Sequence, residues 1–291
     1  MPDGSIENVS DTAFWVAHYR AVESERADAL FRDPLAGVLS GDRGRKIARS
    51  MPWPFMTGWV VALRTRIIDD YIGLGLAQGV EGVLNLGAGL DTRPYRMNLP
   101  ESLLWIEADQ PHLIEFKEQR LSSEKPRCRL ERVKIDLANP CERRQLLESV
   151  PSRAKKMLVL TEGVIPYLSM EEVSSLADDL RNLAHACCWI VDYFSPEALR
   201  FRERGGLRRR MENAPFRFKP ENWFGFFEEH GWNCKEIRYL AEEAERLKRP
   251  IRVPLVLRIV MNLRRLASKQ RRAGLKRHVG YMLLEPAVRR L

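Results

Sequence analysis

The sequence lacks the cysteine patterns of a zinc site or of a disulfide framework. Its 291 residues include five cysteines, and these form no C-x-x-C pair and no Cys/His spacing typical of zinc. We therefore expect no metal site. An odd, sparse set of cysteines is typical of a reducing compartment, so we expect a cytoplasmic protein.

Long apolar runs are also missing. No stretch approaches the roughly 18 apolar residues that a membrane-spanning helix needs, and the longest candidate, from Pro254, is interrupted by Arg258. The first residues include acids and no apolar core of a secretory signal, so export is not expected. With 45% apolar and 30% charged residues, the composition is that of an ordinary globular protein.

The net charge of +9 is concentrated in two segments. Between Arg246 and His278 there are twelve Lys or Arg residues and no Asp or Glu, and between Arg200 and Arg210 only Glu203 opposes the arginines. Apolar residues in the longer segment recur at roughly helical spacing. The favoured interpretation is a basic insertion helix that packs its apolar stripe on the domain. The alternative is a helix that recruits an acidic partner, such as an anionic membrane surface or an acyl carrier protein.

From residue 80 onward, buried-strand patterns alternate with helical patterns. This alternation predicts an α/β fold with a doubly wound, Rossmann-like and mostly parallel sheet. We find no internal repeat or linker, and so predict a single domain over 1–291. Its expected parts are a helical cap (8–75), a cofactor-binding core (80–195) and a C-terminal part (196–291) that contains the basic helical insertion (241–278).

Small or acidic residues follow four successive predicted strands. Ligands of open parallel sheets bind beyond the carboxyl ends of the strands, so we expect these residues to share one site. Asp109 lies about 20 residues after a glycine turn, where an acid receives ribose hydroxyls. The residues are Gly87 and Gly89 after the first strand, Asp109 after the second, Asp136 and Leu137 after the third, and Glu162 after the fourth.

The glycine turn lacks one element of the dinucleotide-binding fingerprint. Thr92 stands where that fingerprint has its third glycine. The difference favours a single adenosine without a pyrophosphate over a nicotinamide cofactor. A nicotinamide-dependent oxidoreductase stays as an alternative.

Several separated motifs occur in a familiar order. They are VSDTAFWVAHYRAVESERADALFRDPLA, ALRTRIIDD, VLNLGAGLDTRPYR, WIEADQP, IDL and LVLTEGVIPYL, spread from Val9 to Leu168. In these motifs the sequence resembles the leucine carboxyl methyltransferase superfamily, and within it the bacterial S-adenosylmethionine-dependent and polyketide O-methyltransferases. The resemblance implies a class I methyltransferase that methylates a carboxyl or hydroxyl oxygen of a small or carrier-linked acceptor. A protein that binds the cofactor without turnover is the second alternative.

The resemblance also implies a role for each strand-end residue. It implies Gly87 and Gly89 as the methionine-side loop, Asp109 as the ribose-binding acid, Asp136 with Leu137 as the pair near adenine, and Glu162 as the glutamate near the methionine amino group. The strand-four motif TEGVIPYL differs from the Asn/Asp-Pro-Pro-Tyr type that amino-methylating enzymes use, which disfavours nucleic acid as the acceptor.

Three arginines match basic positions of the family. Arg66 matches the arginine that pairs with the methionine carboxylate, a role that suits a bidentate fork, and Arg64 is a competing match. Arg32 matches a second basic contact, or is a solvated arginine at a helix end. We name no catalytic base. The residues His18, Tyr19, Tyr167 and Asp192 are candidates for the mouth of the site, with packing or capping as the favoured role.

Overall fold

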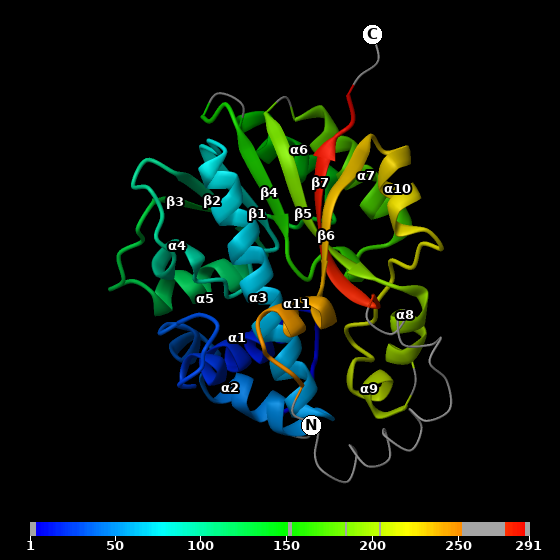
Figure 1. The fold of residues 1–291 in the computed structure, drawn as a ribbon. Coiled ribbons are helices and arrows are strands. Elements are labelled where there is room, and N and C mark those ends of the chain that lie inside the picture. The colour runs from blue at the N-terminus through cyan, green and yellow to red at the C-terminus, as the bar shows by residue number, and fades with distance from the viewer. Residues whose placement is uncertain (1–3, 151–152, 184, 204, 252–276, 289–291) are drawn as a thin grey trace.

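The computed structural model describes residues 4–150, 153–183, 185–203, 205–251 and 277–288. These residues form one seven-stranded sheet with helices on both faces and a further helical layer at one edge (Figure 1). The strands are β1 (Gly82–Leu86), β2 (Leu104–Asp109), β3 (Arg129–Lys134), β4 (Met157–Thr161), β5 (Ala186–Phe194), β6 (Trp232–Tyr239) and β7 (Val279–Pro286).

The strand order is β3-β2-β1-β4-β5-β7-β6. The strands β1 to β5 pair in parallel, and β7 inserts antiparallel between β5 and β6. The central strands β1, β2 and β4 are buried along their whole length, as expected where helices cover both faces. The predicted doubly wound, mostly parallel sheet is confirmed.

Helices cover the two faces of the sheet. The helices are α1 (Asp11–Ser24), α2 (Ala36–Ser50), α3 (Pro54–Ala77), α4 (Arg93–Arg96), α5 (Pro111–Arg120), α6 (Pro140–Ser149), the 3-10 helix η1 (Ile165–Tyr167), α7 (Met170–Asn182), α8 (Pro196–Arg202), α9 (Gly205–Arg210), α10 (Trp223–Glu229) and α11 (Leu240–Arg246). Alternate residues of β1 point to opposite sides: Leu84 packs with residues of α6, α7 and α10, whereas Val83 packs with residues of α3 and α11. Two apolar cores therefore sandwich the sheet.

The N-terminal helices α1 and α2 form a third core below the carboxyl ends of the parallel strands, across from α8 and α9 (Figure 1). The helix α1 begins directly after Ser10, but the Ser10 hydroxyl does not cap it and bonds instead to His112 Nε2 at 3.0 Å. The helix α3 ends at Ala77, and the chain reverses at Gly79, where φ is 80°.

A capping box starts α7. Glu172 N donates to Ser169 Oγ at 3.2 Å, and Ser169 N donates to Glu172 Oε2 at 2.6 Å. This cap places Glu172 at the cavity described below.

The predicted basic helix falls mainly on 252–276, which lie outside the described residues. Among its described residues, Arg249 Nη2 lies 2.5 Å from Glu23 Oε2 of α1, and Arg277 Nε lies 3.0 Å from Glu242 Oε1 of α11, near the start of the predicted insertion. In the part of the chain that the structure describes, no helix is long and apolar enough to cross a membrane.

Candidate functional site

A cavity of about 890 Å³ lies at the carboxyl ends of the parallel strands. Its size is within the usual range for small-molecule and cofactor pockets. The walls come from α1, α3, the β1–α4 loop, the ends of β2 to β5, and α8. The predicted strand-end residues all line it, namely Gly87, Gly89, Asp109, Asp136, Leu137 and Glu162.

The glycine turn holds the second-strand acid in place. Gly87 has a φ of 70°, and a Cβ there would lie 2.3 Å from Val164 Cγ2, so a side chain is excluded. Gly89 N donates to Asp109 Oδ2 at 2.6 Å, and Gln110 N donates to Asp109 Oδ1 at 2.7 Å. Each carboxylate oxygen is thus fixed by one N–H and keeps acceptor capacity at the cavity wall. Burial raises the pKa of Asp109, and the two N–H donors oppose that shift.

The third strand end forms the rim. Asp136 is exposed, and its Oδ1 accepts from Ala138 N at 3.0 Å. The carbonyl of Leu137 accepts from Arg143 Nη1 at 2.8 Å, and buried Arg143 also contacts Asp179 Oδ2 at 2.6 Å. Arg143, which the sequence did not single out, therefore positions the Leu137 backbone at the cavity.

Of the two candidate arginines on α3, the structure places Arg64 at the cavity and Arg66 outside it. Arg66 does not line the cavity; its Nε contacts Asp70 Oδ1 at 2.8 Å and its Nη1 donates to Leu30 O at 3.3 Å. Arg64 lines the cavity, and its Nε lies 2.7 Å from Glu162 Oε1. Two positions along a helix correspond to a rotation of about 200°, which puts the two side chains on different faces.

Arg32 also lies elsewhere. Its Nη1 donates to Arg26 O at 2.9 Å and to Ser24 O, which closes a local surface turn. His18 and Tyr19 do not line the cavity either, whereas Tyr167 and Asp192 do. The interpretation of Arg32 as a residue of the helix end is the one that the structure supports.

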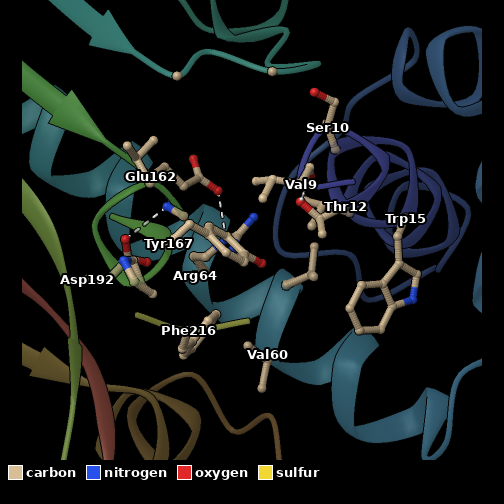
Figure 2. Close-up of a pocket in the computed structure, with 18 of the residues that line it drawn as sticks. Val9, Ser10, Thr12, Trp15, Val60, Arg64, Glu162, Tyr167, Asp192 and Phe216 are labelled. Carbon is tan, nitrogen blue, oxygen red and sulfur yellow. Dashed lines mark hydrogen bonds and ion pairs between the residues drawn. The ribbon is translucent and has the colours of Figure 1, made fainter. Parts of the chain in front are cut away.

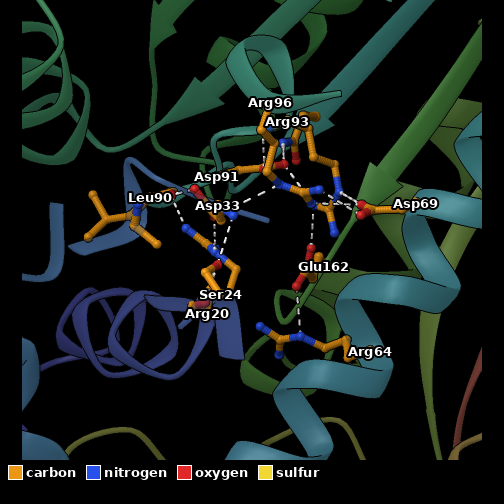
Figure 3. Close-up of polar contacts among 12 residues, drawn as sticks. Arg20, Ser24, Asp33, Arg64, Asp69, Leu90, Asp91, Arg93, Arg96 and Glu162 are labelled. Carbon is orange, nitrogen blue, oxygen red and sulfur yellow. Dashed lines mark hydrogen bonds and ion pairs between the residues drawn. The ribbon is translucent and has the colours of Figure 1, made fainter. Parts of the chain in front are cut away.

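A buried ionic network connects the cavity to the N-terminal layer (Figure 3). It joins four arginines and four acids, so its formal charges cancel. Arg20 Nε contacts Asp33 Oδ2 at 2.9 Å, and Arg96 Nη1 contacts Asp69 Oδ2 at 2.7 Å. The members are Arg20, Arg64, Arg93, Arg96, Asp33, Asp69, Asp91 and Glu162.

Arg93 is the centre of this network. Its side chain is 1% exposed, and it contacts Asp69 Oδ1 at 2.7 Å, Asp91 Oδ2 at 2.8 Å and Glu162 Oε2 at 2.7 Å. Burial alone would raise the pKa of Glu162, but Arg93 and Arg64 outweigh it and hold that pKa below its usual value. Asp91 and Arg93 were missed from the sequence, although two charged residues directly after a buried strand and its glycine turn are the signal of such a pair.

Strand β5 adds another buried acid near its carboxyl end. Asp192 Oδ2 accepts from Gly163 N at 2.9 Å. Burial raises the pKa of Asp192 to about 6, against the opposing charge of Arg64. The carboxyl of Asp192 and the ion pair of Arg64 with Glu162 lie together at one side of the cavity (Figure 2).

The remainder of the cavity is largely apolar and aromatic. Figure 2 shows Val9 and Trp15 from the N-terminal region, Val60 from α3, and Tyr167 and Phe216 around this part. The ring centroids of Tyr167 and Phe216 are 5.2 Å apart in an edge-to-face arrangement. The cavity thus divides into a polar half at the strand ends and an apolar half between α1, α3 and α8.

The strand order, the antiparallel last strand and the acid at the end of β2 define a class I S-adenosylmethionine-dependent methyltransferase fold. Two solved structures resemble it over most of its length. One is a DUF574 family protein from Streptomyces avermitilis (TM-score 0.55, 15% identity, 93% of this chain and 96% of that chain). The other is a "putative methyltransferase" from Thermobifida fusca (TM-score 0.55, 13% identity, 94% of each chain).

The sequence comparisons identify the family. Residues 13–181, more than half of the chain, match the model of the leucine carboxyl methyltransferase family. A Mycobacterium marinum protein named "Putative S-adenosyl-L-methionine-dependent methyltransferase" is 31% identical over 280 residues, which cover 86% of this chain and 88% of that protein. A Mycobacteroides abscessus protein of the same name is 29% identical, over 84% and 90% of the two chains. The chain belongs to the leucine carboxyl methyltransferase family, which confirms the resemblance found in its motifs.

Proposed function

We propose that this methyltransferase transfers the methyl group of S-adenosylmethionine to a carboxyl or hydroxyl oxygen of a small or carrier-linked acceptor. The observation that supports it best is the single cavity in which a fixed ribose-type acid, Asp109, and a charged pair, Arg64 with Glu162, adjoin an apolar half. The polar half matches a nucleoside with a zwitterionic tail, and the apolar half offers room for an acceptor.

The residues of the polar half fit the cofactor part by part. Asp109 would accept the two ribose hydroxyls, and Asp136 with Leu137 would lie at the adenine. The amino acid end of the cofactor carries both charges, so we assign its carboxylate to Arg64 and its amino group to Glu162. When bound, the cofactor supplies a methyl group activated by its sulfonium. The chain's contribution is alignment and exclusion of water, on the order of 7–11 kcal/mol for good positioning.

The need for a base depends on the acceptor. A carboxylate is already a nucleophile, whereas a hydroxyl benefits from a group that takes its proton. For a hydroxyl acceptor we assign this role to Asp192, which lines the cavity. With a pKa raised to about 6, Asp192 is ionised at neutral pH and is a stronger base than an ordinary carboxylate.

We also propose that the basic segment 246–278 binds an acidic partner. An acidic carrier protein or an anionic membrane surface would bring a carrier-linked or lipid-like acceptor to this cavity. Twelve basic residues without a single acid support the idea of an acidic partner.

Product analysis tests the oxygen specificity. The parent chain, incubated with methyl-labelled S-adenosylmethionine and a small-molecule extract of the source organism, is expected to yield a labelled methyl ester or methyl ether. Mild alkali identifies a methyl ester, because esters hydrolyse whereas methyl ethers and N-methyl groups do not, and fragmentation in the mass spectrometer then distinguishes O-methyl from N-methyl among the alkali-stable products. A base-stable N-methyl product would contradict oxygen transfer, and the absence of any product would favour cofactor binding without turnover.

The assignment of Arg64 is testable with a matched pair of variants on α3. Arg64→Met is expected to weaken S-adenosylmethionine binding at least about tenfold, because it removes a charged hydrogen-bond donor from the cavity. Arg66→Met makes the same chemical change outside the cavity, and we expect the affinity of this variant for S-adenosylmethionine to stay within about twofold of the parent's. Isothermal titration calorimetry measures both. The reverse order, with Arg66→Met as the weaker binder, would restore the family match at Arg66.

A further inference from the structure

Arg202, the last residue of α8, lies in the apolar half of the cavity. Its guanidinium carbon lies 3.9 Å from the centroid of the Phe216 ring, which fixes the guanidinium over an aromatic face. Tyr167, which borders the same part of the cavity, is its electrostatic neighbour. The charge of Arg202 is thus placed where the acceptor, rather than the cofactor, would lie.

Within the described part of the chain, Arg202 differs from the other arginines of the cavity in having no carboxylate partner. Arg20 pairs with Asp33, Arg64 with Glu162, and Arg217 Nη1 with Glu172 Oε2 at 3.1 Å. Among the residues that the structure describes, no carboxylate lies within ion-pair distance of Arg202. The segment 252–276 contains no Asp or Glu and cannot supply one.

The acids nearest to Arg202 in the sequence are engaged elsewhere. Glu197 Oε1 contacts Arg200 Nη2 at 2.9 Å, and Glu203 pairs with Lys219. Burial, with only the neighbouring Tyr167 to oppose it, lowers the pKa of Arg202, which nevertheless stays protonated as guanidinium groups do in proteins. Arg202 is partly buried, and a cation that loses part of its hydration without a counter-ion is stabilised by an anion bound beside it.

The residues around Arg202 indicate the chemistry of the rest of the molecule that carries this anion. Phe216 and Tyr167 border it, and at the cavity wall Phe201 stacks on Trp53 with 5.7 Å between ring centroids. Phe201 and Trp53 are 52% and 38% exposed, so two aromatic rings that no core requires are available at the opening. An apolar body with one acidic group is the chemistry that matches these walls.

We propose that Arg202 is a specificity-determining residue that binds an anionic group on an otherwise apolar acceptor. This inference rests on the proposed function and names the acceptor class that the cavity takes. The anion paired with Arg202 is the recognition group and not the methylated oxygen, because a guanidinium fork neutralises the oxygens it binds and so weakens them as nucleophiles.

The test measures the binding of matched anionic and neutral probes to the full chain saturated with S-adenosylhomocysteine. The probes are 2-naphthoate and decanoate, each compared with its primary amide of nearly equal size. We expect the parent to bind at least one carboxylate about tenfold or more tightly than its amide. In Arg202→Met this preference is expected to vanish, because the apolar contacts stay and the charge is gone.

Arg217→Met is the matched control, since Arg217 lines the same cavity but is already paired with Glu172. The control is expected to keep the carboxylate preference. Equal binding of acid and amide by the parent, or no binding of either carboxylate at millimolar concentration, overturns the inference, as does an equal loss in the two variants. Titration of S-adenosylhomocysteine into each protein separates this result from the proposed function: a parent that fails to bind it fails the proposed function, whereas intact cofactor affinity without anion preference rejects only the role of Arg202.

Discussion

An Asp109→Ala variant is expected to bind S-adenosylmethionine about 10- to 150-fold more weakly than the parent chain. Hydrogen bonds to a charged group contribute about 1.5–3 kcal/mol, and each 1.4 kcal/mol is a factor of ten in affinity. Asp109 has two roles. It would accept hydrogen bonds from the ribose hydroxyls, and it also accepts from Gly89 N at 2.6 Å, which shapes the glycine turn. Calorimetry with the purified variant measures the loss directly.

The control for this variant is Asp136→Ala. Asp136 lines the same cavity, but it is exposed, and its carboxylate accepts from Ala138 N in its own turn. Water competes at such a rim, so we expect a loss of no more than about fivefold. Thermal unfolding of both variants checks that the fold is kept. An Asp109→Ala variant with parental affinity would remove the ribose role of this acid and, with it, the main support for the cofactor assignment.

The strand-end residues could be predicted because the sheet itself brings them together. In a parallel sheet every strand ends at the same edge, so residues such as Gly89, Asp109 and Glu162 converge whatever the details of the helices. Their spacing along the chain already contains this information, and the structure places all of them in one cavity.

The arginine on α3 could not be chosen in the same way. Sequence spacing places both Arg64 and Arg66 near the site, but the rotation of a helix about its axis is set by packing. Here Ile67, Ile68 and Tyr71 of α3 are buried against the sheet, and that contact turns Arg64 to the cavity and leaves Arg66 with Asp70. The partner of each arginine is therefore a tertiary property.

The same holds for Arg202, which the sequence places in a basic cluster typical of a solvated surface. Its partial burial follows from α8, which begins at Pro196 after the N-cap Ser195, whose Oγ accepts from Ala198 N at 3.2 Å, and from Phe216, which lies between α9 and α10. Composition shows the charge but not the ring beneath it.

Arg93→Met is expected to lower the free energy of unfolding by about 3–5 kcal/mol, because it leaves buried carboxylates without their shared cation. Asp91, Glu162 and Asp69 all contact Arg93 within 2.8 Å. Arg93 thereby connects separate parts of the chain, since Glu162 lies 69 residues from it in the sequence. Met keeps most of the volume of the side chain, so lost packing contributes little. Urea denaturation followed by circular dichroism gives the difference.

Arg66→Met serves as the matched control for this stability measurement. The pair of Arg66 with Asp70 lies at the surface, with the arginine side chain 38% exposed, and such pairs contribute about 0–1 kcal/mol. If Arg93→Met lowers the free energy of unfolding no more than Arg66→Met does, the network does not hold the N-terminal layer to the sheet. A loss restored in part by adding Glu162→Gln would show instead that the uncompensated charge, and not the missing side chain, causes the destabilisation.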